Sequence, residues 1–426
     1  MVLKNIKKLK SLKKQLPHRD NLLVALDIGT ENVKALIGKV VGGDIEIIGV
    51  GRAHQGLSDM SSGAIADISG VVANCDKALA EAEEMAGVSA KAAVVGIAGE
   101  LVKGASTTVR FRRRDATQAI DMDEMERIVK LIQDRAYDAA KNQLGWEIGN
   151  KDVEVRLVNS AIVSMSIDGQ RITNPIGFQG RDLAIQLYTA FAPLVHIGAL
   201  EQVCKELELD LVAVTAEPFA VARSVIGNDS TTSFSAILID VGGGTTDIAI
   251  VNDGGVEGTK MFGIGGRSYT RTLANELGVD FEMAEKLKLA LAGHELPEKR
   301  RTTIESALSK TLDVWMSGVE LGLSEFDKLE HLPRKILLCG GGSSLDILVE
   351  ALEQKEWYRD LPFTRKPIVE HIKPEQVVGI VDKTDAIKDH TVITAMGLLR
   401  VGVDTIGDVD NDQASIKQRL NRLLSI

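Results

Sequence analysis

Aromatic residues are scarce in this sequence, at 4 % of 426 residues. A surface that stacks nucleic-acid bases on aromatic side chains is therefore not expected, and the core must consist mainly of Ala, Val, Ile and Leu. Proline is also scarce, at 9 residues, and the apolar and charged fractions of 44 % and 26 % exclude a disordered or fibrous chain. At roughly 100–200 residues per domain, the length allows about two to four folded units.

Cysteines and long apolar runs are lacking too. The three cysteines, Cys75, Cys204 and Cys339, are isolated from one another, which excludes a disulfide framework and metal-ligand spacing and indicates a reducing cytoplasm. Polar residues interrupt the most apolar region, 183–203, so no membrane-spanning helix is predicted. The short apolar run at 22–26 is not a signal peptide. We expect the protein to stay inside the cell.

Charge is distributed unevenly. The net charge is −10, yet residues 1–20 carry seven basic side chains and one acidic one. An acidic body argues against nucleic-acid binding, whereas the basic arm suits an anionic surface. Apolar residues of the arm fall within one half of a helix, so a second membrane contact and a solvated basic tail remain equal alternatives.

An internal repeat is the strongest organisational signal. LLVALDIGTENVKALIGKV (22–40) and AILIDVGGGTTDIAIVNDG (236–254) share one plan of apolar strand, Asp, Gly-rich turn with Thr, and second strand. The aspartates Asp27 and Asp240 are 213 residues apart, half the chain. Two copies of one hairpin imply two similar α/β domains that face each other.

The remaining elements follow from periodicity. The pattern predicts a helix at 57–86 ended by Gly87, a strand at 90–99, an amphipathic helix at 121–143 and strands within 153–192. Together, 91–192 reads as a β/helix/β insert within the first domain. The second half holds a mostly helical block at 267–330, then a strand, a Gly-rich turn and a helix at 335–352. Leucines are assigned to the buried face of the helical block: Leu273, Leu277, Leu287, Leu291, Leu308, Leu312 and Leu321.

Three Gly-rich turns could carry chemistry. The turn after Asp27 offers backbone N–H groups and a Thr hydroxyl to phosphate oxygens, although a plain hairpin turn would look the same. The segment 240–247 has three successive glycines, which lets a phosphate approach the backbone closely. The third turn, 340–344, lies between a strand and a helix N-terminus, a position that favours anions.

This set of turns resembles the superfamily of actin, hexokinase and DnaK-type chaperones, in which ATP lies between two duplicated domains. The segment AEPFAVARS (216–224) looks like the connection between the two halves. A closer resemblance, over roughly 20–402 and again in the tail, is to the bacterial cell-division family FtsA. It rests on DIGTENVKALIG, IIGVGRAHQGL (47–57), ITNPIGFQG (172–180), DVGGGTTDIAI, GIGGRSYTRTLANELG (263–278), AEKLK (284–288), LCGGGSSL and AMGLLRVG (395–402).

The resemblance implies an actin/DnaK-type duplicated two-domain α/β fold with a nucleotide cleft and the FtsA-type insert called 1C. The implied parts are a basic arm (1–20), subdomain 1A (21–90 and 193–231), insert 1C (91–192), subdomain 2A (232–266 and 331–402), subdomain 2B (267–330), a linker (403–413) and a membrane-targeting helix (414–426). The basic arm and the short linker depart from the family's pattern.

The resemblance also implies a site for ATP and Mg²⁺. Asp27 and Asp240 would hold Mg²⁺ through waters, because Mg²⁺ dehydrates reluctantly, and Glu217 would orient the water in any hydrolysis, which would be slow at most. Glu285 and Lys288 would border the adenosine. The implied cofactor-binding residues are Asp27, Gly29, Thr30, Asn32, Asp240, Gly242, Gly243, Gly244, Thr245, Gly265, Gly266, Glu285, Lys288, Gly340, Gly341, Gly342 and Ser343.

The implied function is that of a peripheral protein on the cytoplasmic side of the cell membrane at the division site. Such a protein polymerises and anchors filaments of the tubulin-like protein FtsZ, whose C-terminal peptide binds subdomain 2B, while other division proteins bind 1C. The tail supports membrane attachment independently, as an interfacial amphipathic helix, with a helix docked on the body as the alternative. Its apolar face is Ile416, Leu420, Leu423 and Leu424, flanked by Lys417, Arg419 and Arg422.

Other classes of protein remain open. A PilM-like pilus-assembly adaptor has the same type of insert, although a membrane-binding tail favours FtsA. A sugar kinase would need an acidic base beside a sugar pocket. A DnaK-type chaperone would need a C-terminal peptide-binding domain, and the residues after 402 are too few to form one.

Overall fold

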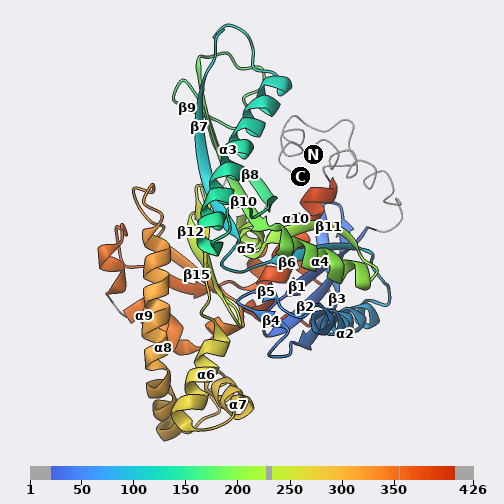
Figure 1. Ribbon diagram of the computed structural model, residues 1–426, viewed down its shortest axis with the longest axis vertical. Coiled ribbons are helices and arrows are strands. Elements are labelled where there is room, and N and C mark those ends of the chain that lie inside the picture. Colours follow the sequence, from blue (N-terminus) through green and yellow to red (C-terminus); the bar gives the residue numbers. More distant parts are fainter. Residues whose placement is uncertain (1–20, 227–232, 355, 408–426) are drawn as a thin grey trace.

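The computed structural model describes residues 21–226, 233–354 and 356–407, which form two lobes with an insert at one end and a helical block at the other (Figure 1). The basic arm and the membrane-targeting helix predicted from the sequence lie outside the described residues. The sheet of the first lobe has the strand order β11 (Asp210–Ala216), β6 (Ala92–Ile97), β1 (Leu22–Ile28), β2 (Asn32–Val41), β3 (Asp44–His54) and β17 (Ile380–Asp382).

A second, longer sheet runs through the other lobe and into the insert. Its strand order is β16 (Ile368–His371), β15 (Lys335–Cys339), β12 (Ala236–Val241), β13 (Thr246–Asn252), β14 (Gly255–Phe262), β7 (Lys103–Arg112), β10 (Asp182–Pro193), β8 (Val155–Ile167) and β9 (Gln170–Ile172). The central strands are buried on both faces, which explains why β1 and β12 read as continuous apolar runs.

The duplication predicted from the two hairpins is confirmed by the strand order. The series β3-β2-β1-β6-β11 in the first sheet matches β14-β13-β12-β15-β16 in the second. In both series the first three strands are antiparallel neighbours and the last two are added parallel. Each hairpin therefore occupies the same place in its own lobe.

Helices of the first lobe cover its sheet. They are α2 (Ile68–Ala86), α4 (Leu194–Glu206), α5 (Glu217–Ile226) and α10 (Ile393–Gly407). Asp67 caps α2 by accepting from the Ser69 and Gly70 N–H groups, and Gly87 ends it in the left-handed conformation. The predicted helix start at 57 is wrong, because residues 57–67 form turns and the short strands β4 (Met60–Ser61) and β5 (Ala64–Ile65).

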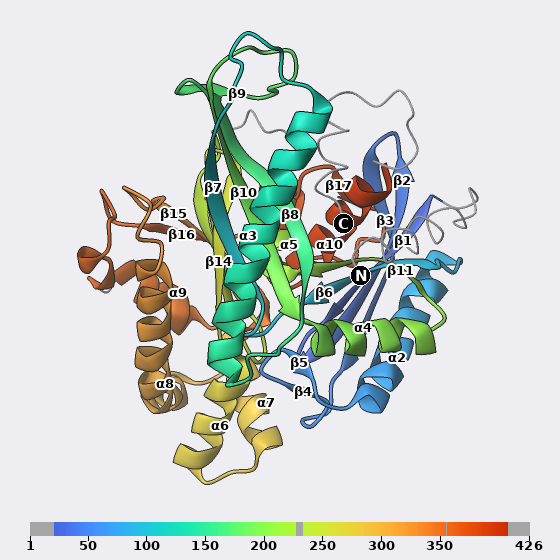
Figure 2. The ribbon, with the colours of Figure 1, turned by 45° about the horizontal axis from the view of Figure 1, so that its top comes forward.

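The insert is a sheet with one long helix, α3 (Met122–Ile148), lying along it (Figure 2). The predicted helix at 121–143 is confirmed and continues one turn further, to the left-handed Gly149. The strand Ala92–Ile97 was assigned to the insert, but it pairs with β1 and β11 in the first-lobe sheet, so the boundary at 91 is wrong. The insert's sheet joins the second lobe, through pairing of Gly258 and Thr259 with β7.

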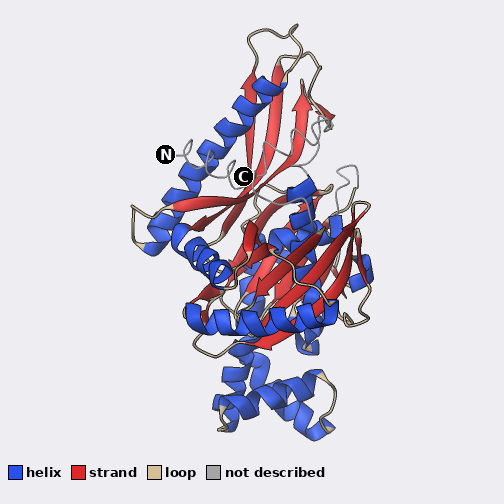
Figure 3. Cartoon of the chain, turned by 90° about the vertical axis from the view of Figure 1, so that its right-hand side faces the viewer, coloured by secondary structure: helices blue, strands red, loops and turns tan. Residues whose placement is uncertain are grey.

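The helical block comprises α6 (Gly266–Leu277), α7 (Phe281–Ala292) and α8 (Glu298–Ser324), with α6 and α7 at the lower end of Figures 1 and 3. Most leucines assigned to its core are buried or half-buried. Leu321 is the exception: it is 64 % exposed, because α8 is buried along one face only and Leu321 lies outside it.

The chain returns to the first lobe before its end. After β15 come a short helical turn η1 (Gly341–Ser344) and α9 (Asp346–Gln354) in the second lobe, and then β17 pairs with β3 while α10 packs in the first-lobe core. The assignment of all of 331–402 to the second domain is therefore wrong for its C-terminal part, from β17 onwards. The predicted linker start at 403 is also wrong, because α10 continues to Gly407. Short 3₁₀ turns complete the structure: η2 (Trp357–Asp360), η3 (Pro374–Gln376) and η4 (His390–Val392).

The described residues include all three cysteines and the most apolar region, 183–203. Cys75, Cys204 and Cys339 are free and buried. No helix in the ranges 21–226, 233–354 and 356–407 is both long and apolar enough to cross a membrane.

Candidate nucleotide site

The turns of the two repeated hairpins meet where the lobes join. A Cβ on Gly244 would lie 2.6 Å from Thr30 Oγ1, and one on Gly243 would lie 2.7 Å from Glu31 Cβ. Any larger residue would push the lobes apart, so this contact explains the glycines. The structure thus brings the predicted segments 29–32 and 242–245 together, and we call their meeting place the interlobe site.

The third Gly-rich turn packs beneath the second hairpin. Gly340 has φ of 81°, and a Cβ there would lie 2.0 Å from Asp240 Oδ1, so only glycine fits. Ser343 is buried and its hydroxyl donates to the Gly340 carbonyl at 2.8 Å. Gly341, in contrast, faces open space.

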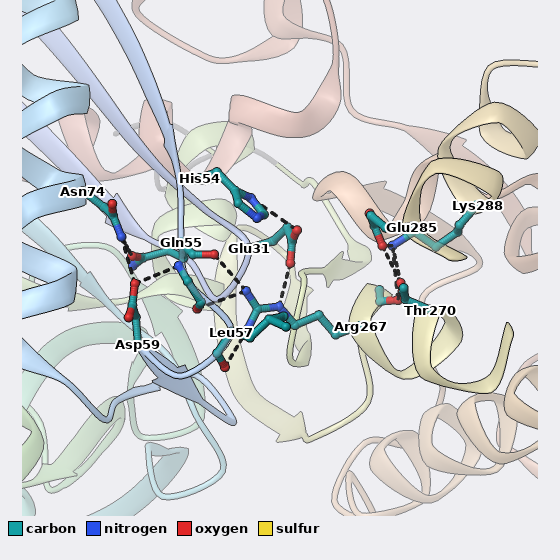
Figure 4. A network of polar contacts seen from close by, with 12 residues as sticks. Glu31, His54, Gln55, Leu57, Asp59, Asn74, Arg267, Thr270, Glu285 and Lys288 are labelled. Carbon is teal, nitrogen blue, oxygen red and sulfur yellow. Dashed lines mark hydrogen bonds and ion pairs between the residues drawn. The ribbon is translucent and has the colours of Figure 1, made fainter. Parts of the chain in front are cut away.

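A further pair of glycines joins α6 to the same hairpin. The Gly266 N–H donates to the Gly242 carbonyl at 2.9 Å. Lys288 holds this turn from α7: its Nζ donates to the Gly266 carbonyl at 3.2 Å and pairs with Glu285 at 2.8 Å (Figure 4). Thr270 lies between them, accepting from Lys288 and donating to Glu285.

Carboxylates outnumber cations at the interlobe site. Asp27, Asp240, Asp247 and Glu217 are all buried. Lys34 neutralises one of them, with Nζ 2.8 Å from Asp27 Oδ2. Burial opposes the charge of this amine, yet the Asp27 charge and hydrogen bond raise the pKa of Lys34.

The other three carboxyl groups have raised pKa values. Burial raises the pKa of Glu217 well above its usual range, and the charges of Asp27, Asp247 and Asp240 raise it further. Burial also raises the pKa of Asp240 and, strongly, that of Asp247. Asp247 Oδ1 has no hydrogen-bond partner among the described residues. Buried acids that repel one another in this way are suited to facing a cation.

Mg²⁺ and a polyphosphate fit these residues better than a metal ion alone. In the part of the chain that the structure describes, no group of three His, Cys, Asp or Glu side chains could hold a metal. Mg²⁺ usually binds through one or two carboxylates, waters and the phosphates of a nucleotide. The glycines at 29 and 242–244 expose backbone beside the carboxylates, as phosphate oxygens require.

Some residues of the interlobe site were missed by sequence reasoning. Lys34 could have been found, because a turn at 29–31 pairs residue 27 with residue 34 across the hairpin. Asp247 pairs with Asp240 in the second hairpin by the same rule. Thr394, whose hydroxyl donates to Asp240, comes from α10 and had no signal in the sequence.

The sequence is similar to those of known cell division proteins. The family model for "Cell division protein FtsA" matches residues 237–397. The cell division protein FtsA of Pseudomonas aeruginosa is 26 % identical over 437 residues, covering 94 % of this chain and 97 % of the relative. FtsA of Neisseria meningitidis serogroup B is 27 % identical over 420 residues, covering 92 % and 93 %.

Among solved structures, the PilM-PilN type IV pilus biogenesis complex contains a chain with a similar fold. Its TM-score is 0.65 at 16 % identity, covering 91 % of this chain and 99 % of that one. The duplicated sheets and facing hairpins define an actin-like two-lobed protein. By these relatives and this family match, the chain is similar to FtsA cell division proteins over nearly its whole length.

Proposed function

We propose that this chain binds ATP with Mg²⁺ at the interlobe site, polymerises on the cytoplasmic side of the cell membrane at the division site, and anchors FtsZ filaments there. One observation carries the nucleotide part of this proposal. The Gly-rich turns of the two hairpins meet beside four buried carboxylates, and Lys34 pairs with one of these, Asp27. Similarity to FtsA cell division proteins supports the rest.

In this proposal a different group of residues binds each part of the Mg²⁺-ATP ligand. Bound Mg²⁺ supplies positive charge to the phosphates. Backbone N–H groups of the turns at 29–32 and 242–245, with the Thr30 and Thr245 hydroxyls, hold phosphate oxygens. Asp27 and Asp240 face the metal through waters. The adenosine lies between Gly265–Gly266, Glu285 with Lys288, and the 340–343 turn.

Glu217 is suited to orienting a water for hydrolysis. It is the first residue of α5 and packs against Gly96, where a Cβ would lie 2.8 Å from Glu217 Oε1. Asp247, whose Oδ1 lacks a hydrogen-bond partner within the described ranges, is the second polar group available to that water. Turnover would be slow at most, with nucleotide binding mainly controlling assembly.

The predicted tail helix would attach the protein reversibly. Four apolar side chains half-buried at an interface contribute about 3–6 kcal/mol, and three cations add roughly 1 kcal/mol each near anionic lipid. Ordering the helix opposes this by about 1 kcal/mol or more per residue. A filament with many tails binds far more firmly, so polymerisation and attachment promote each other. The basic arm 1–20 is a further candidate for lipid contact.

The helical block α6–α8 is the proposed binding site for the C-terminal peptide of FtsZ. The insert is the proposed binding site for other division proteins. Large apolar side chains are exposed on the block, which is what a docked amphipathic peptide would cover. They are Met283, Leu289, Val314 and Leu321.

A PilM-like adaptor is the second candidate, favoured by the fold of the PilM-PilN complex. Sedimentation of the full chain with ATP, vesicles containing anionic lipid, and FtsZ with or without its C-terminal peptide separates the two. The FtsA-like proposal expects co-sedimentation of FtsZ only with its peptide. Equal binding of FtsZ lacking the peptide would reject the peptide site, and the absence of any FtsZ binding would favour the adaptor.

A further inference from the structure

Arg267 crosses from the second lobe into the first. It is the second residue of α6, and its backbone N–H donates to the Gly243 carbonyl at 2.8 Å, which ties it to the second lobe. Its side chain is only 4 % exposed. The guanidinium Nε lies 2.6 Å from Glu31 Oε2, in the turn of the first hairpin (Figure 4).

The rest of the guanidinium also binds the first lobe. Nη2 donates to the carbonyls of Gln55 and Gly56 at 3.3 and 3.5 Å, and Nη1 donates to that of Leu57 at 3.4 Å. These four hydrogen bonds of the Arg267 side chain are therefore all with the opposite lobe. We call Glu31 together with residues 55–57 the arginine socket.

The socket is held in place by its own lobe. The Gln55 N–H donates to the Glu31 carbonyl at 2.9 Å, which ties the loop to the first hairpin. Behind it, buried Asn74 on α2 donates to the Gln55 and Asp59 side chains at 2.8 and 2.9 Å, and Asp59 accepts from the Gly56 N–H. The backbone carbonyls that accept from Arg267 are thus held in position by their own lobe.

Closure of the two lobes and the contact of Arg267 with the arginine socket depend on each other. A buried guanidinium is costly unless it is paired, and removing one partner of a buried ion pair is strongly destabilising. Opening of the lobes would separate Arg267 from Glu31 and from three carbonyls at once. The hairpin turns touch at Gly243 and Gly244, so the same opening would also separate the two turns that border the interlobe site.

We propose that Arg267 and its socket form a clamp that holds the two lobes closed, so that breaking it limits nucleotide exchange. The exchange part of this inference rests on the proposed nucleotide site, whereas the closure part does not. The second lobe supplies the arginine and the first lobe supplies the acid, 236 residues away. Nucleotide release and lobe opening are then one event.

The kinetic test uses the full chain and fluorescently labelled ATP with Mg²⁺. After loading, excess unlabelled ATP is added and the dissociation rate is measured for the wild type, Arg267→Gln, Glu31→Gln and the double variant. Each single change should accelerate release at least tenfold, and the double variant should be little faster than either, because both remove the same pair. Arg271→Gln, an exposed arginine on the same helix, is the matched control and should release at the wild-type rate.

A second experiment measures the distance between the two lobes in the absence of nucleotide. Spin labels at Ala73→Cys on α2 and Asn275→Cys on α6 report the distance between lobes, since both positions are exposed and the native cysteines are buried. Arg267→Gln should lengthen or broaden this distance, and Arg267→Lys, which keeps the charge, should have a smaller effect. Unchanged release and unchanged distance would each overturn the corresponding part of the clamp. If the wild type binds no ATP, the proposed function fails, while the distances still decide whether the clamp exists.

Discussion

The indole Nε1 of Trp315 donates to the Thr246 hydroxyl at 2.9 Å, at the first residue of strand β13. Trp315 is fully buried in α8, and Thr246 immediately follows the Gly-rich turn of the second hairpin. The same hydroxyl donates to the Ile264 carbonyl at 2.7 Å, just before α6. One side-chain contact therefore connects the helical block to the interlobe site.

Replacing Trp315 by Phe should destabilise the protein by about 2–4 kcal/mol, because it leaves a cavity and removes the hydrogen bond to Thr246. Trp146→Phe is the matched control: that indole is 85 % exposed, and its loss should change stability by no more than about 0.5 kcal/mol. Denaturant unfolding of both variants measures the difference. Equal midpoints would mean that the buried contact contributes nothing.

Removing a metal-facing carboxylate should weaken nucleotide binding. Asp240→Ala and Asp27→Ala are each expected to lower Mg²⁺-ATP affinity about tenfold to a hundredfold, the effect of losing a charged partner worth roughly 1.5–3 kcal/mol. Asp76→Ala, on the exposed face of α2, should bind like the wild type. If labelled ATP bound both site variants as tightly as the wild type, the assignment of the site would be wrong.

Binding of Mg²⁺-ATP should release protons. Burial and neighbouring charges raise the pKa values of Glu217, Asp240 and Asp247, and a bound cation would favour their charged forms. Calorimetry in two buffers of different ionisation enthalpy measures the protons released. Asp247→Asn should release fewer, and a binding enthalpy independent of the buffer in the wild type would contradict the expected linkage.

Mild acid should destabilise the protein through His390. Its ring stacks on that of His371 with centroids 4.0 Å apart, and burial together with the His371 charge lowers the pKa of His390 to about 4. Since the unfolded chain has a pKa of about 6.5 for this group, it binds the proton more readily than the folded state, and stability falls as pH drops from about 6.5 towards 4.

The variant His390→Gln should lose part of this acid sensitivity. Melting temperatures at pH 7 and pH 5 measure the loss for the wild type and the variant. His331→Gln, at a largely exposed imidazole, is the control and should keep the wild-type dependence. An unchanged difference between the two pH values in His390→Gln would rule out this histidine as the source.

The predicted tail helix should decide membrane attachment. Leu420→Glu or Leu423→Glu is expected to abolish sedimentation with anionic vesicles while ATP binding persists, because a charge enters the apolar face. Gln418→Glu adds the same charge to the polar face and should weaken binding only slightly. High salt should weaken wild-type binding. If the leucine variants still sediment, the arm 1–20 becomes the leading anchor, and its deletion in that background tests it.

Local features of the fold could be predicted from the sequence. The two hairpins, the helix capped by Asp121 and the Gly-rich turn at 340–344 depend on residues a few positions apart, whose propensities and capping act within one segment. The repeated hairpin further predicted two similar lobes, which the matching strand orders confirm. The residue types around Asp27 and Asp240 also predict phosphate and metal chemistry, which stays a prediction until nucleotide binding is measured.

Only the tertiary structure decided which segments meet. Nothing local places α10 in the first lobe or sends the Thr394 hydroxyl to Asp240, because that helix is apolar enough to pack on either sheet. No local pattern pairs Arg267 with Glu31, and they become a largely buried ion pair because two separate lobes close on each other. Contacts between distant segments depend on the packing of whole sheets, a sum over many weak interactions that no short stretch of sequence encodes.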